Sequence, residues 1–212
     1  MDETAKKLID KIKSNKLNNR SLGVALNDLL DAYKKGASLR SIELLILSDS
    51  LGDIRNGAWI LSELGSLACQ DFDNYKNLIR HQDSKVRFYM TDPYLLCASN
   101  PEDISSLLLL LEDNNEIIRW KAIDTISRLS TEQITTWIYF YENKPFYWQY
   151  KEGMNLLNMD NTMLTLKKHF ALKEKLLNTF ALIYCLRSNF SESKTQELAA
   201  ECSNEDVSNF FN

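Results

Sequence analysis

Apolar residues recur at helical spacing along much of the chain, in short segments separated by polar breaks. Over 104–111 they follow the i, i+3, i+4, i+7 spacing of one helix face. Polar residues interrupt the pattern at 113–115, and a second apolar stripe with a period near 3.6 follows over 117–126. Pro101 suits the first turn of the earlier helix, where its missing N–H would be unpaired anyway. The pattern predicts two helices joined by a short polar turn.

The same pair of helices recurs with a step of 32 residues. Three Arg residues mark equivalent positions in the repeats: Arg55, Arg87 and Arg119. The step extends backwards more weakly, since Gly23 takes the place of the Arg. A helix pair this short cannot bury its apolar stripe alone, so stacked neighbours must bury it. We therefore expect an all-α fold, an α-solenoid of helical hairpins with irregular terminal helices.

A short motif identifies the kind of repeat. The pattern D-x-x-V-R at Asp83–Arg87, with its variant at Asn115–Arg119, resembles the second helix of HEAT repeats over roughly residues 40–130. Asp83 and Asn115 stand where a side-chain oxygen can cap the new helix. Tetratricopeptide and ankyrin arrays have similar periods, but their signature motifs are absent from the chain.

Two positions depart from the HEAT-like pattern. Leu51 stands at the capping position of the first repeat. Pro93 falls inside the second helix of the middle repeat, where it removes a backbone donor and should kink the helix.

The repeated Arg has a role in the families that the motif resembles. In HEAT-like repeats such an Arg typically contacts an acidic or capping group of the adjacent repeat. The resemblance therefore implies that Arg55, Arg87 and Arg119 form a structural ladder that holds the repeats in register. A ladder that binds a ligand is the alternative.

We expect one all-α domain over 1–212 with three parts. Residues 1–40 are predicted to form an N-terminal cap with a degenerate repeat, and 41–130 the HEAT-like repeats. Residues 131–212 are predicted to form an aromatic helix hairpin and C-terminal capping helices, as terminal units of solenoids are often atypical.

The stretch 135–150, TTWIYFYENKPFYWQY, holds eight of the chain's 22 aromatic residues. Its spacing predicts two helical arms about a break at 142–145. Tyr and Trp carry polar tips that suit half-buried or partner-facing positions. Two interpretations stay open: the hairpin completes the core, or Tyr147, Trp148 and Tyr150 meet a protein partner.

Composition narrows the class of protein. The six Gly and three Pro residues are too few for the tight turns of sheets. No apolar run reaches about 18 residues, and the start of the chain lacks the apolar core of a signal peptide, so we expect no membrane contact and a cytoplasmic protein. The four cysteines are far apart and show no C-x-x-C spacing, so we expect reduced core residues.

No motif in the chain carries a recognisable reaction. Phosphate-binding loops, dinucleotide fingerprints, zincin motifs and nucleophile elbows are absent, and His81 and His169 have no partnered motif. We therefore expect no catalytic residue, no metal site and no cofactor.

Charge is unevenly distributed along the chain. Residues 1–40 hold nine basic and five acidic residues, whereas 41–160 hold ten and eighteen, a net charge of −8. A nucleic-acid binder needs a positive field facing the phosphates, so we expect no nucleic-acid partner. An acidic surface favours a basic protein instead, and Asp92 and Asp124 are candidate contacts.

These observations favour a non-catalytic module that binds a partner protein. Acidic helical proteins include bacterial immunity proteins that neutralise basic toxins, which offers an analogy. A generic scaffold is one alternative. Another is a HEAT-like DNA glycosylase, a class that uses Trp and Asp near a flipped base, because Trp120 and Asp124 lie at i, i+4.

Overall fold

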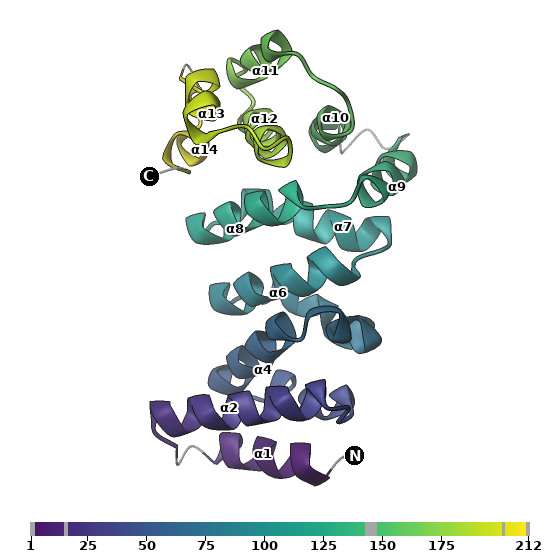
Figure 1. The fold of residues 1–212 in the computed structure, drawn as a ribbon, viewed down its shortest axis with the longest axis vertical. Helices are drawn as coiled ribbons and strands as arrows, with labels where there is room; N and C mark the ends of the chain where they lie inside the picture. Colours follow the sequence, from purple (N-terminus) through teal and green to yellow (C-terminus); the bar gives the residue numbers. More distant parts are fainter. Residues whose placement is uncertain (1–2, 15–16, 143–147, 201, 211–212) are drawn as a thin grey trace. The chain divides into compact units, whose positions relative to one another are not determined.

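The fold is that of a computed structural model, which describes residues 3–14, 17–142, 148–200 and 202–210 (Figure 1). Every regular element in these ranges is an α-helix or a 3-10 helix, and none of the described residues lies in a strand. The predicted all-α class is confirmed.

The chain divides into two compact units, Met1–Cys97 and Ala98–Asn212, which are described separately. The expected single domain, with its parts at 1–40, 41–130 and 131–212, stays a prediction.

The first unit is built from short helices. Its elements are α1 (Glu3–Lys13), α2 (Asn19–Lys34), η1 (Leu39–Ile42), α3 (Glu43–Ile46), α4 (Leu51–Glu63), η2 (Gly65–Asp71), α5 (Phe72–Tyr75), η3 (Lys76–Arg80) and α6 (Ser84–Cys97). Helix α1 packs on α2, and α4 packs on α3 and α6 (Figure 1). Each helix buries one apolar face, as α1 does with Ala5, Ile9 and Ile12.

The second unit begins with α7 (Pro101–Leu108), η4 (Leu109–Glu112), α8 (Glu116–Ser127) and α9 (Thr131–Tyr141). It continues with α10 (Trp148–Leu157), α11 (Met163–Phe170), α12 (Lys175–Arg187), α13 (Glu192–Leu198) and α14 (Glu205–Asn209). The chain turns between α11 and α12 over residues 171–174, and Leu164 on α11 is exposed.

Helix α12 is the centre of the second unit. It packs against α8, α10, α11 and α14 (Figure 1). All ten residues from Leu176 to Cys185 are buried. Helix α10 approaches it closely because Gly153 faces the ring of Phe180. A Cβ at Gly153 would lie 2.1 Å from that ring, so a larger residue would push the helices apart.

The second helices of the predicted repeats keep their spacing. Helix α4 begins at Leu51, α6 at Ser84 and α8 at Glu116, so the starts lie 33 and 32 residues apart. The first helix of each pair joins a short α-helix, of four, four and eight residues, to a 3-10 turn: η1 with α3, α5 with η3, and α7 with η4. The stacked solenoid itself stays a prediction.

Side-chain caps explain where these helices begin. The Val86 N–H donates to Oδ1 of Asp83 at 3.2 Å, and Asn115 accepts from the Ile117 N–H at 3.0 Å, as expected for capping residues. In the first repeat the cap is Ser50, one residue before the aligned Leu51. The hydroxyl of Ser50 supplies the acceptor that Leu51 lacks.

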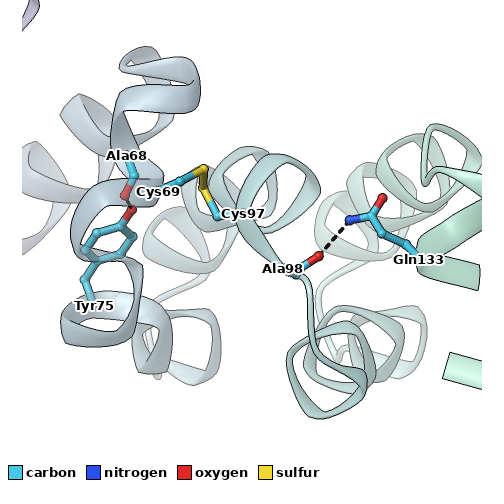
Figure 2. Close-up of a disulfide and its surroundings, with 6 residues drawn as sticks. All are labelled: Ala68, Cys69, Tyr75, Cys97, Ala98 and Gln133. Carbon is cyan, nitrogen blue, oxygen red and sulfur yellow. Dashed lines mark hydrogen bonds between the residues drawn. A yellow bond between two sulfur atoms is a disulfide. The ribbon is translucent and has the colours of Figure 1, made fainter. Parts of the chain in front are cut away.

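The expectation of four reduced cysteines is wrong for two of them. Cys69 and Cys97 form a disulfide that ties η2 to the end of α6 (Figure 2). Packing of η2 on α6 brings their Cα atoms within 5.0 Å although 28 residues separate them, which the spacing of cysteines alone does not reveal. Cys185 and Cys202 are free, and burial raises the pKa of the Cys185 thiol to about 12.

In the ranges that the structure covers, no helix is both long enough and apolar enough to span a bilayer.

Candidate interaction surface

The first predicted ladder residue joins α4 to the start of α6. Arg55 in α4 donates from Nε to Oδ1 of Asp83 at 3.0 Å and from Nη2 to Oδ2 at 2.5 Å. Asp83 also caps α6 through Val86, so one carboxylate starts a helix and receives the Arg. The hydrogen bonds from Arg55 lower the pKa of Asp83 from 3.8 to about 2.

The third ladder residue makes a similar pair with a distant partner. Arg119 in α8 donates from Nε and Nη2 to the two carboxylate oxygens of Asp206, at 2.8 and 2.6 Å. Its Nη1 donates to the carbonyl oxygen of Asp113 at 2.8 Å. The pair therefore fixes α14 on α8.

The middle ladder residue differs from its two counterparts. Nη1 of Arg87 donates to the carbonyl oxygens of His81 and Gln82, at 2.8 and 2.9 Å. These bonds hold the turn before α6.

The two candidate acids occupy different environments. Asp92 is half-buried on α6. Asp124 is exposed on α8 and accepts a hydrogen bond from Nη2 of Arg128 at 2.7 Å, a pair at i, i+4. The half-buried Trp120 lies one turn before Asp124, and its buried indole N–H has no hydrogen-bond partner among the described residues.

The first arm of the aromatic stretch contributes to the core and to the surface. Trp137 is fully buried and donates from Nε1 to Oγ of Ser105 at 2.8 Å, and its ring stacks on Tyr141 at 4.7 Å. Tyr139 and Phe140, on the same helix, are 77% and 43% exposed. Helix α9 therefore has a buried aromatic side and an exposed aromatic side.

The second arm is divided in the same way. Trp148 is 53% exposed. Tyr150 is buried, and its hydroxyl donates to the carboxylate of Glu112. The ring of Tyr150 therefore belongs to the core. Tyr147 lies outside the described residues.

The exposed aromatic residues of α9 line an open groove. Its walls are Pro101 at the start of α7 and Thr135, Thr136, Tyr139 and Phe140 of α9, and its volume is about 550 Å³. The groove exists because α7 packs beside α9. Sequence reasoning missed it, although the spacing of the four α9 residues places them on one helix face.

The helices that form the groove are acidic. Helices α7 and α9 carry Glu102, Asp103 and Glu132 and no Lys or Arg. Glu142 follows directly as the C-cap residue of α9. Both first-turn glutamates, Glu102 and Glu132, are exposed, whereas Asp103 is buried and its carboxylate accepts a hydrogen bond from the side chain of Asn100.

The described residues were also compared with the side-chain clusters that bind metal ions. Within them, no group of three or more His, Cys, Asp or Glu residues is placed to hold a metal ion. His169 lies 3.9 Å from a carboxylate oxygen of Glu152, and its Nδ1 lies 2.9 Å from the carbonyl oxygen of Thr165.

Comparisons of the chain with protein-family models, with curated proteins and with solved structures found no match. The resemblance to HEAT repeats therefore stays a prediction that depends on the motif and the spacing of the helices.

Proposed function

We propose that the protein is a non-catalytic protein–protein interaction module that binds a basic partner protein through an acidic surface. One observation carries the proposal. Residues 98–142 of the second unit hold eight acidic and three basic residues, a net charge of −5. A field of one sign over a compact surface attracts a partner of the opposite charge and speeds its association.

Ion pairs involve two of the three basic residues, and one of these pairs also uses an acid of the segment, Asp124. Of the three basic residues, Arg119 is bonded to Asp206 and Arg128 to Asp124. Exposed Glu102, Glu116 and Glu132 lie on the same segment.

The architecture that fits this function is a short solenoid of HEAT-like helix pairs. Such arrays present extended binding surfaces built from many short helices. The recurring starts of α4, α6 and α8 support this proposal. A bacterial immunity protein, which neutralises a basic toxin, is the specific form of the function that the acidic charge favours.

The location of the protein follows from a separate feature. A cytoplasmic location was expected from the sequence, but the Cys69–Cys97 disulfide favours an oxidising compartment. Cytosolic reductants keep most protein thiols reduced.

The proposal is tested by affinity capture with the immobilised full chain, from an extract of the native host and from the purified products of neighbouring genes. We expect capture of a basic polypeptide that elutes with rising salt. The matched variant, with Glu102, Glu116, Glu132 and Glu142 all changed to Gln, should retain much less of it. Failure to capture any polypeptide, or equal capture by both chains, would refute the proposal.

A gel shift with duplex DNA in the same buffer distinguishes the proposed function from a nucleic-acid-binding function. Binding of DNA by the chain would favour a nucleic-acid function and would contradict the acidic-surface account.

A further inference from the structure

The groove formed by α7 and α9 has the composition of a recognition surface. Tyr139 is 77% exposed, and the adjacent Phe140 is 43% exposed. Tyr residues are enriched where proteins meet, because the ring offers contact area at a low entropy cost and the hydroxyl stays wet. A ring that is mostly exposed on an ordered helix gains little from folding, so its contact energy is available to a partner.

The exposed face of α9 is held firmly from behind. Trp137 anchors the helix to α7 through its hydrogen bond to Ser105. Gln133 fixes the start of the helix twice: its Oε1 accepts from the Ser130 N–H at 2.9 Å, and its Nε2 donates to the carbonyl oxygen of Ala98 at 2.8 Å (Figure 2). The groove is therefore preformed, which lowers the entropy cost of binding.

The electrostatics of the groove select the charge of its occupant. Tyr139 and Phe140 lie in the last turn of α9, and the Lys151 ammonium donates to the carbonyl oxygen of Glu142 at that end at 2.8 Å. Glu142 caps that end, and Glu132 and Glu102 lie in the first turns of the two helices. A cation above the ring of Tyr139 would gain from the ring face and from the negative charge that the exposed glutamates give these two helices.

Arginine fits these features better than lysine. Its guanidinium stacks on aromatic faces and is more weakly hydrated than an ammonium, while its aliphatic stem can lie on an apolar wall. Pro101, Phe140 and the methyl groups of Thr135 and Thr136 provide that wall.

We propose that this groove, defined by Pro101, Thr135, Thr136, Tyr139 and Phe140, binds an arginine-bearing segment of the basic partner protein. The guanidinium lies on Tyr139 near the C-terminal end of α9, and the aliphatic stem lies against Phe140 and Pro101. The inference rests on the proposed function, and it assigns that function to one site on the second unit.

The probe for the test is a short acetylated and amidated peptide that alternates Arg with Leu. The readout is the amide spectrum of the ¹⁵N-labelled full chain. We expect shifts at Thr135, Thr136, Tyr139 and Phe140, and no binding of the same peptide with Glu in place of Arg. The variant Tyr139→Ala should bind the Arg peptide about fivefold or more weakly than the native chain does. The matched control Leu164→Ala, which removes an exposed side chain of α11, should not change it.

Several outcomes would overturn the assignment. They are no shifts at the groove, equal binding of the Glu peptide, or unchanged binding by Tyr139→Ala. Shifts at the groove that grow with protein concentration alone would assign it to a second copy of the chain instead.

Capture of the whole partner separates this inference from the proposed function. If Tyr139→Ala captures a basic partner as well as the native chain does, the groove assignment fails and the proposed function stands. If the native chain captures no basic partner, the proposed function fails and the assignment fails with it.

Discussion

Arg119 and Asp206 form a two-bond ion pair across 87 residues of sequence, with nitrogen–oxygen distances of 2.8 and 2.6 Å. The pair attaches the short helix α14 to α8, and both side chains are only 22% exposed. The hydrogen bonds to Asp206 raise the pKa of Arg119 above its ordinary value. The end of the chain is thus held by one of the predicted ladder residues.

Replacing Asp206 with Asn should lower the free energy of unfolding by about 1–2 kcal/mol, because a partly buried charged hydrogen-bond pair is lost. Urea unfolding of the full chain measures the loss. The matched control is Asp124→Asn, which breaks an exposed i, i+4 pair with Arg128 and should cost only about 0.3–0.5 kcal/mol. Equal losses in the two variants would contradict a structural role for the Arg119 pair.

The pairing of Asp83 with Arg55 predicts a pH dependence of stability. The pKa of Asp83 is about 2 in the folded chain, below its ordinary value of 3.8, chiefly because Arg55 donates to the carboxylate. A lowered pKa means that the stabilisation is present above about pH 4 and is lost as pH falls towards about 2.

The thermal unfolding midpoint of Asp83→Asn should therefore be lower than that of the native chain at pH 6. The difference between the two midpoints should shrink between pH 4 and pH 2. Thermal unfolding across this range measures it. A difference that stays constant down to pH 2 would show that the carboxylate charge is not what stabilises the turn.

The Cys69–Cys97 disulfide predicts sensitivity to reductants. It closes a loop with a sequence separation of 28 residues, and removing such a cross-link typically costs about 3 kcal/mol by raising the entropy of the unfolded chain. Cys69→Ser combined with Cys97→Ser, and the native chain in dithiothreitol, should lose similar stability. Alkylation in denaturant should modify two thiols without reductant and four with it. Four modified thiols in both cases would show that the disulfide is absent.

Two tryptophans on neighbouring helices should respond oppositely to replacement by Phe. Trp137→Phe removes the buried hydrogen bond to Ser105 and should cost about 2 kcal/mol. Trp120→Phe removes a buried N–H that lacks a partner, so its unfolding midpoint should stay unchanged or rise. Urea unfolding decides between them. A loss at Trp120 as large as that at Trp137 would contradict the difference in pairing.

Local signals in the sequence predicted local structure. Pro101 does stand in the first turn of α7, and Asn115 does cap α8. Helix caps and apolar periodicity depend on residues only a few positions apart, so they can be predicted from a single sequence. The misplaced cap of α4, Leu51 in place of Ser50, is a shift by one residue.

Contacts between residues far apart in the sequence could not be predicted in the same way. The partner of Arg119 is Asp206, and the partner of Cys69 is Cys97. Both pairs depend on which helices pack together, and the 32-residue step does not predict which helices those are. The groove has the same origin, since its walls come from two helices that meet only after α9 folds onto α7.

The most direct test of the account is the dissociation constant of the captured basic partner, measured by calorimetry at 50 mM and 300 mM NaCl with the native full chain. An acidic surface that attracts a basic partner predicts an affinity at least about tenfold weaker at the higher salt concentration, because screening shortens the range of the attraction. An affinity that does not change with salt would contradict the account.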